Sequence, residues 1–145
     1  MTLIISSDAY VRVTAHLQAA YPNEGVGLLL GRADGAYPDL RKTAQAVLAL
    51  PNRFEASEQH HRYLVTAQDM LDGENEAARL GLDVIGVFHS HPDHPAQASE
   101  YDLEFALPWY SYLIVSVQNG SAADARAWVL ADDRSQFVNE EFKIE

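Results

Sequence analysis

The chain of 145 residues contains no cysteine, so disulfide bonds and thiolate chemistry are excluded. Any metal site must therefore use nitrogen and oxygen ligands. A long apolar run is also missing, because the hydrophobic stretches are strand-sized and far shorter than the roughly 20 residues that a membrane helix needs. The first residues have neither a basic segment nor a small-residue cleavage site. We therefore expect no signal peptide, no membrane partner and a cytoplasmic location.

Positive charge is scarce as well. Ten lysines and arginines stand against 21 aspartates and glutamates, which gives a net charge of −11 with neutral histidines. Such a chain is not expected to bind nucleic acid, whose phosphates require basic patches. The acidic residues gather in segments 55–76 and 132–145. They indicate a solvated surface that aids solubility, electrostatic steering of a basic partner, or the acidic composition of a salt-loving host.

Turn signals divide the sequence into short apolar segments and longer amphipathic ones. Strands are predicted over 3–5, 25–31, 41–49, 62–65, 83–89, 112–117, 125–130 and, as a last edge strand, 135–144. Helices are predicted over 8–20, capped by Ser7 or Asp8, and over 66–80 and 99–107. The expected fold class is α/β (α+β mixed sheet), a curved mixed sheet of about six to eight strands flanked by about three helices. We expect one domain over residues 1–145.

A pair of histidines follows the apolar run 84–88, which is typical of a buried strand. Alternate side chains of a strand leave the same face, so the rings of His89 and His91 should project together while Ser90 points away. Pro92 cannot donate to a strand ladder, so the strand should end near the second histidine. The pair indicates a metal site, although His-x-His alone is equally compatible with a structural role.

Asp102 is the third candidate ligand. With His89 and His91 it would supply the three protein ligands of a catalytic zinc site, leaving a fourth position for water. Nitrogen and oxygen donors in this combination suit zinc and disfavour calcium. Ser99 and Asp102 are also residues that favour the N-terminus of a helix, with Ser99 as the N-cap. The two interpretations are compatible, because the start of a helix can present a ligand.

Glu24 directly precedes the predicted strand 25–31, which contains three glycines, so its side chain would lie at the start of that strand. Alone it would be interpreted as an ordinary solvated turn residue. Zinc lowers the pKa of a bound water to about 7, and a nearby carboxylate can then take the proton. Together with the histidine pair, Glu24 therefore completes the parts of a metallohydrolase.

These residues resemble the signature of the JAMM/MPN zinc metallopeptidases, which is a glutamate followed downstream by His-x-His-Pro, six residues and Ser-x-x-Asp. Here the pattern is filled by Glu24, His89-Ser90-His91-Pro92, the six residues 93–98 and Ser99-Glu100-Tyr101-Asp102. Segments 24–31 and 51–54 also resemble the family's first strand and its asparagine region. The resemblance runs from about Val11 to Val117 and is to the compact prokaryotic type.

The resemblance implies an MPN-like domain of cytidine-deaminase-like architecture and one Zn2+ ion held by His89, His91 and Asp102. It implies a deubiquitinase-like peptidase or isopeptidase that cuts after the C-terminal glycine of a ubiquitin-like or sulfur-carrier protein. Glu24 would activate the zinc-bound water and return its proton to the leaving amine. Ser99 would help stabilise the oxyanion by donating a hydrogen bond to it.

The chain is short compared with larger family members, whose insertions and C-terminal helices grip the ubiquitin-like substrate. Recognition is therefore expected at the edge of the sheet, by pairing with an extended substrate tail. Small sulfur carriers that end in Gly-Gly, or their cysteine adducts, are favoured over ubiquitin itself. The sequence does not set an oligomeric state.

Two rival functions are compatible with parts of the sequence. A catalytically silent MPN-type scaffold would usually have lost a ligand or the glutamate, and this chain keeps all of them. A different zinc hydrolase or deaminase is disfavoured, because related deaminases need a Pro-Cys-x-x-Cys motif. The other histidines are not assigned to the metal. His94 is expected at the surface or behind the ligands, His60 and His61 in a solvated segment or edge strand, and His16 partly exposed on the first helix.

Overall fold

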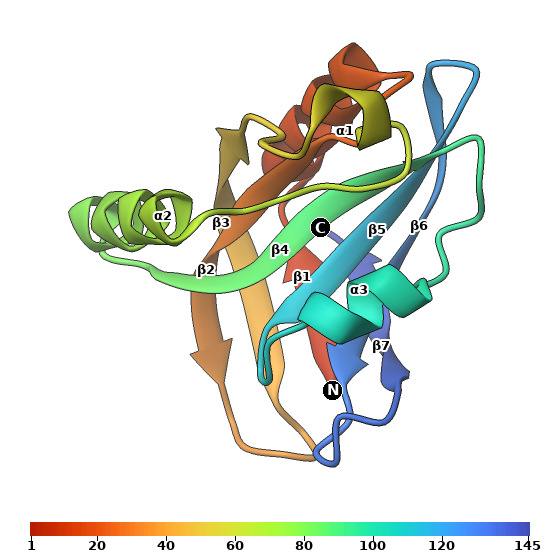
Figure 1. The fold of residues 1–145 in the computed structure, drawn as a ribbon. Helices are drawn as coiled ribbons and strands as arrows, with labels where there is room; N and C mark the ends of the chain where they lie inside the picture. Colours follow the sequence, from red (N-terminus) through yellow and green to blue (C-terminus); the bar gives the residue numbers. More distant parts are fainter.

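The computed structural model describes residues 1–145, which form seven strands and three α-helices (Figure 1). The strands are β1 (Thr2–Ile5), β2 (Val26–Asp34), β3 (Arg41–Leu50), β4 (Asp83–Pro92), β5 (Ser111–Gln118), β6 (Ser121–Leu130) and β7 (Phe137–Ile144). The helices are α1 (Ser7–Ala20), α2 (Ala67–Leu80) and α3 (Glu100–Phe105), with one 3-10 turn, η1 (Ala56–Glu58). None of these helices has the length and apolarity that crossing a membrane would require.

The strands form one mixed sheet in the order β1-β3-β2-β4-β5-β6-β7, which closes into a barrel. β1 runs parallel to both β3 and β7, and β4 runs parallel to β5. The remaining neighbours are antiparallel. The predicted α/β class, the mixed sheet and the number of helices are confirmed.

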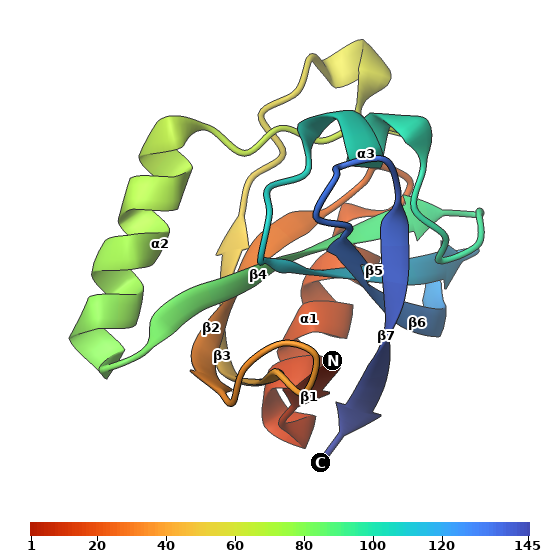
Figure 2. The same cartoon turned by 90° about the horizontal axis from the view of Figure 1, so that it is seen from below.

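α1 lies against the inner face of the barrel, between β2 and β3 on one side and β5 to β7 on the other (Figure 2). Its residues Ala9, Val13 and Leu17 recur at helical spacing and are buried among apolar side chains of the strands. The N-cap is Ser6, whose hydroxyl accepts a hydrogen bond from the backbone N–H of Ala9, rather than the predicted Ser7 or Asp8.

α2 and the end of α3 pack on the outer face. Apolar side chains of β2 and β4 there form a second buried cluster with Ala77 of α2 and with Ala106, which follows α3. α2 starts with the predicted capping box, in which the Thr66 hydroxyl accepts from Asp69 N–H and the Asp69 carboxylate accepts from Thr66 N–H. Gly81 ends the helix in a left-handed conformation.

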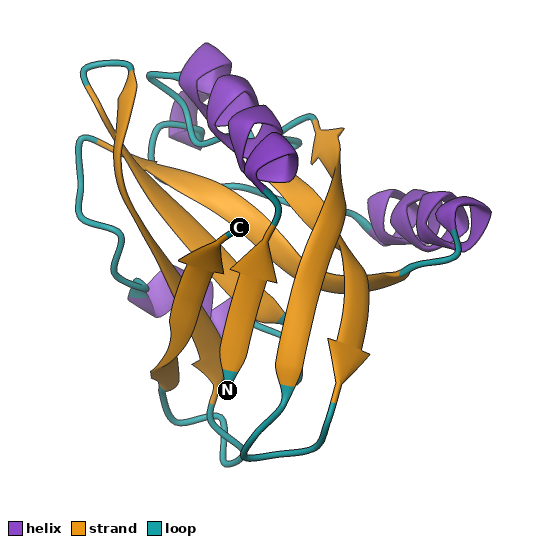
Figure 3. Ribbon diagram, turned by 180° about the vertical axis from the view of Figure 1, so that it is seen from behind, coloured by secondary structure: helices purple, strands orange, loops and turns teal.

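The barrel closure corrects one expectation and narrows another. β7 was predicted as an edge strand of an open sheet, but it pairs with both β6 and β1, so the sheet is closed (Figure 3). Its weak alternation identifies a strand but not how many neighbours that strand has. Each strand has two neighbours, but β1 pairs with only Arg41–Ala44 of β3 and β7 with only Ala127–Leu130 of β6. The sheet edge expected to receive a substrate tail is therefore restricted to the remaining parts of β3 and β6.

The strand predicted over residues 62–65 does not form. This segment connects η1 to α2 and runs across β4 in Figure 1, without a strand ladder. Asn52 holds it by its side chain: the amide nitrogen donates to the Arg62 carbonyl at 2.9 Å, and the amide oxygen accepts from Leu64 N–H at 3.3 Å. The alternating apolar residues Tyr63 and Val65 pack against the outer cluster, which is why the pattern resembled a strand.

Candidate metal centre

β4 presents the two histidines as the sequence predicts. His89 pairs with Val26 of β2 and His91 with Ser116 of β5, so both lie in a strand that has neighbours on either side. Their ring centroids are 5.2 Å apart. The intervening Ser90 is used elsewhere, because its hydroxyl accepts a hydrogen bond from Gly25 N–H at 2.9 Å.

Asp102 reaches these histidines from the first turn of α3. The Ser99 hydroxyl accepts from Asp102 N–H at 3.1 Å, and Asp102 Oδ2 accepts from Ser99 N–H at 2.9 Å, which is a second capping box. The carboxylate also lies 3.1 Å from Nε2 of His89 and 3.1 Å from Nε2 of His91. One ligand atom from each of the three buried residues lies within 4.8 Å of the other two. The group could therefore hold a metal ion.

The hydrogen bonding of the histidines tests whether a metal fits. His89 is completely buried, yet neither ring nitrogen has a hydrogen-bond partner, because Nε2 faces Asp102 without hydrogen-bond geometry. Buried polar atoms in proteins are nearly always partnered. His91 instead uses Nδ1 against the Pro95 carbonyl at 2.9 Å and turns Nε2 toward Asp102. An orphaned imidazole nitrogen beside a second imidazole and a carboxylate fits the donor set of a zinc site.

Charges in the group also suit a cation. Burial alone would raise the pKa of Asp102, but His89 and His91 outweigh it and hold that pKa well below its usual range. Burial lowers the pKa of His89, which favours the neutral imidazole that metal binding needs. Asp102 thus supplies a negative charge and His89 an unprotonated nitrogen.

Glu24 lies in the loop before β2 and is 5% exposed. Its backbone is held on both sides, since its N–H donates to the Gln59 carbonyl at 2.7 Å and its carbonyl accepts from Asn52 at 2.9 Å. It lines a hollow of about 360 Å³ together with His91 and Ser99. Burial raises the pKa of Glu24 to about 8, a shift that His91 opposes and Asp102 reinforces. Such a carboxyl group can exchange a proton near neutral pH.

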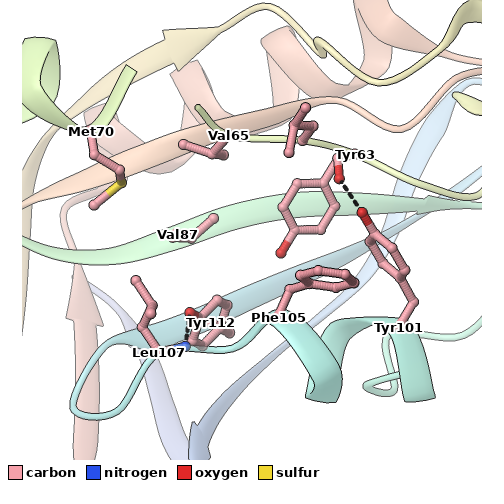
Figure 4. Close-up of a pocket in the computed structure, with 9 residues that line it drawn as sticks. Tyr63, Val65, Met70, Val87, Tyr101, Phe105, Leu107 and Tyr112 are labelled. Atoms are coloured by element: carbon pink, nitrogen blue, oxygen red, sulfur yellow. Dashed lines mark hydrogen bonds between the residues drawn. The ribbon is translucent and has the colours of Figure 1, made fainter. Parts of the chain in front are cut away.

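A second cavity, of about 240 Å³, adjoins the group and has an entirely apolar and aromatic lining (Figure 4). Tyr63 and Val87 line one part of it, and Tyr101 and Phe105 of α3 line another. The Tyr63 ring stacks on His89, with centroids 4.5 Å apart and planes at 29°. The candidate metal centre therefore adjoins an apolar cavity through Tyr63, which stacks on His89, and a polar hollow through His91.

The structure thus brings together all five residues singled out in the sequence, namely Glu24, His89, His91, Ser99 and Asp102. Tyr63, Asn52 and Gln59 were not singled out as site residues. Their only sequence signals were the apolar alternation of 63 and 65 and the segment 51–54, and neither shows a contact with the site.

The remaining histidines lie outside the group. His94 is exposed and lines the polar hollow. His61 is also exposed and contacts Glu58 at 2.8 Å and His60 at 2.7 Å. His16 is partly buried, with Nε2 at 3.0 Å from the Val26 carbonyl and 3.1 Å from that of Leu50.

The fold and the donor set define a barrel protein with a candidate site for a single metal ion. Residues 6–131 match the family described as prokaryotic homologs of the JAB domain, and the chain belongs to this family.

Two curated proteins are similar in sequence. The probable TtuB-protein conjugate cleaving protease of Thermus thermophilus is 32% identical over 114 residues, which are 79% of this chain and 70% of that protein. COP9 signalosome complex subunit 5 of Caenorhabditis elegans is 29% identical, and the match covers 81% of this chain and 33% of that protein. The chain thus spans about a third of the length of the second relative.

Solved structures share the fold. A Desulfitobacterium hafniense protein superposes with a TM-score of 0.83 at 26% identity, covering 99% of this chain and 92% of that one. A Salinibacter ruber protein gives a TM-score of 0.74 at 39% identity, covering 97% and 90%. A JAB1/MPN domain protein of Archaeoglobus fulgidus gives 0.58 at 20% identity, covering 97% and 98%, which supports the fold alone.

Proposed function

We propose that this protein is a zinc-dependent peptidase or isopeptidase that cuts after the C-terminal glycine of a ubiquitin-like or sulfur-carrier protein. The observation that carries the proposal is the buried group of His89, His91 and Asp102 with Glu24 beside it in one hollow. Family membership supports this assignment. The relative named as a TtuB-protein conjugate cleaving protease supports the substrate class.

Glu24 is proposed as the general base and acid. Zinc, when bound, would lower the pKa of a coordinated water and polarise the scissile carbonyl. Glu24 would take a proton from the attacking water and deliver it to the leaving amine. Its backbone bonds to Gln59 and Asn52 fix its position. Burial raises its pKa in the metal-free protein, which favours its taking up a proton.

Ser99 is proposed to stabilise the oxyanion. Its oxygen already accepts a hydrogen bond from Asp102 N–H, which leaves its own O–H proton to donate to a substrate oxygen. The side chain belongs to the same hollow as Glu24. A donor held in place by a helix cap needs little reorganisation when negative charge develops on the substrate oxygen.

The two cavities support an orientation for the substrate. The apolar cavity beside His89 would take the extended tail that precedes the terminal glycine, and the polar hollow beside His91 would take the amine side. This orientation is an alternative to pairing at the sheet edge, which the barrel leaves only on the parts of β3 and β6 that β1 and β7 do not cover.

The test is a cleavage assay with zinc-loaded wild type, Glu24→Gln and, as a matched control, Glu55→Gln, which changes an exposed carboxylate. Substrates are carrier–cysteine, carrier–lysine and linear Gly-Gly fusions, with products identified by mass spectrometry. We expect cleavage after the glycine by wild type and the control. Glu24→Gln should keep its zinc but lose at least about 10²-fold in rate.

Fully zinc-loaded wild type that cuts none of these substrates would refute the proposal and favour a silent scaffold. Wild-type turnover by Glu24→Gln would remove Glu24 from the mechanism.

A further inference from the structure

No protein group contacts the second ring nitrogen of His89, the atom through which a metal-ligating histidine is ordinarily oriented. Such imidazoles almost always donate their second ring N–H to a carboxylate, a carbonyl or water. His91 follows this rule through the Pro95 carbonyl at 2.9 Å. The Nδ1 atom of His89 is buried without a partner. No protein group holds this nitrogen, so what the protein itself supplies to orient the His89 ring is the packing around it.

The ring packed most nearly parallel to His89 is that of Tyr63. The two centroids are 4.5 Å apart and the planes differ by 29°, within the range of stacked aromatic pairs. The His91 ring is farther away, at 5.2 Å, and is tilted by 53°. Tyr63 is thus placed to limit rotation of the His89 ring.

The backbone around Tyr63 is hydrogen-bonded to α3, which carries Asp102, and through Asn52 to the loop that carries Glu24. Its carbonyl accepts a hydrogen bond from the Tyr101 hydroxyl at 2.9 Å, and Tyr101 directly precedes Asp102 in α3 (Figure 4). Asn52 holds the residues on either side of Tyr63 and also donates to the Glu24 carbonyl at 2.9 Å. The segment around Tyr63 is therefore anchored by side chains, although it belongs to no strand.

We propose that Tyr63 is a positioning residue for His89, and that its ring does for His89 what the Pro95 carbonyl does for His91. The ring, rather than the hydroxyl, carries this role. Tyr63 also lines the apolar cavity, so one side chain joins the metal group to the surface proposed for the substrate tail. The inference rests on the proposed function only in taking zinc as the ion.

The first measurement is zinc affinity, by competition with a chromophoric chelator, for wild type and for Tyr63→Phe, Tyr63→Leu and Tyr63→Met. Loss of a supporting partner of a metal ligand weakens metal binding by about 10–100-fold, which we expect for the Leu and Met variants, with Phe within about threefold of wild type. Leu64→Ala is the matched control, because Leu64 lines the same cavity and is 41% exposed. Its zinc affinity should be unchanged.

The second measurement is the visible absorption spectrum of the cobalt-substituted proteins, which reports ligand geometry without any substrate. We expect altered bands for Tyr63→Leu and Tyr63→Met and wild-type bands for Tyr63→Phe. Urea unfolding of the metal-free proteins separates a loss of stability from a loss of metal geometry.

Unchanged zinc affinity and spectra in the Leu and Met variants would overturn the inference. A Phe variant as weak as the Leu variant would overturn it too, by assigning the effect to the hydroxyl. If neither the Leu nor the Met variant folds while Phe does, Tyr63 is a packing residue and the inference fails. Wild type that binds no zinc would instead refute the proposed function.

Discussion

Glu24 is an acidic side chain that the fold keeps away from solvent. Burial raises its pKa to about 8, and the nearby Asp102 adds to the shift while His91 reduces it. Carboxyl groups displaced this far toward neutrality are typical of acid–base sites. Keeping such a group ionised in the metal-free protein opposes folding.

This gives a stability prediction for metal-free Glu24→Gln. The pKa of Glu24 is about 8 in the folded protein against 4.5 for a free glutamate. Because folding raises this pKa, wild type has its full stability below about pH 4.5 and loses stability progressively as the pH rises toward and through 8. Glutamine carries no proton to lose, so the variant should be more stable than wild type by roughly 3 kcal/mol at pH 7.

Urea unfolding of both metal-free proteins at pH 4.5, 6 and 7.5 measures this difference. We expect the gap between the two free energies of unfolding to widen with pH. A gap that stays constant across this range would show that Glu24 does not titrate as its burial implies.

Residue type and spacing were enough to select Glu24, His89, His91, Ser99 and Asp102, because metal ligands and acid–base groups come from a short list of side chains. Tyr63 could not be selected in this way. It lies 26 residues before His89, and an aromatic residue in an alternating segment gives no sign of which ring it will stack on. Positioning contacts of this kind depend on tertiary structure alone.

At the scale of elements, the contact between β2 and β4 sets the distance between Glu24 and the histidines. Gly27 of β2 pairs with Phe88 of β4. A Cβ at Gly27 would lie 2.2 Å from the Phe88 ring and 2.6 Å from the Leu48 carbonyl oxygen. The absence of a side chain at Gly27 therefore allows both neighbouring strands to approach.

Gly27→Ala should force these strands apart. We expect a loss of about 1–3 kcal/mol in the free energy of unfolding, as for other overpacked cores, together with weaker zinc binding. Gly81→Ala is the control, since its Cβ would meet no atom closer than 3.9 Å but its φ of +70° is strained for alanine. It should lose about 1 kcal/mol through backbone strain and keep its zinc affinity.

Urea unfolding and chelator competition on the two variants give both quantities. A Gly27→Ala protein with wild-type stability and zinc affinity would contradict this account of the strand contact.

Most elements were predictable because their signals are local. The capping box at Thr66 and Asp69 and the left-handed Gly81 fix α2 within a few residues. Residues 62–65 were mispredicted because apolar alternation reports which face is buried and not which backbone groups are bonded. Their partner is the side chain of Asn52, and no local pattern encodes that.

At the scale of the whole molecule, the inner core and the candidate metal centre are separate. Phe88 of β4 packs in the core cluster around α1, whereas its neighbour Val87 packs in the outer cluster. His89 and His91 alternate with Phe88 along β4 and so lie on the same face as Val87. The ligands come from the end of β4 and the start of α3. The barrel should therefore fold without metal, and metal binding should add stability to a structure that already exists.

Removal of zinc with a chelator should abolish hydrolysis and leave the far-UV circular dichroism spectrum unchanged. A free zinc concentration 100-fold above its dissociation constant stabilises the fold by about 2.7 kcal/mol. For a chain of this size, the melting temperature should then fall by roughly 5–10 °C on chelation. Scanning fluorimetry with and without added zinc measures the shift, and a chain that unfolds when zinc is removed would contradict the separation of core and site.

Barrel closure is the global feature that the sequence did not reveal. It depends on parallel pairing between the first and last strands, with Thr2 opposite Glu141. Neither strand carries a signal for the other, and both would look the same at the edges of an open sheet. Leu3 and Ile5 of β1 and Phe142 of β7 all pack in the cluster around α1, so the two ends of the sheet share one core.

Zinc-edge anomalous diffraction from crystals of the zinc-loaded protein tests the central claim most directly. We expect one strong peak about 2.0–2.1 Å from a nitrogen of His89 and of His91 and about 2.0–2.2 Å from an oxygen of Asp102, with Glu24 facing the open position. A peak at His60 and His61 instead, or no peak among the three ligands, would contradict it.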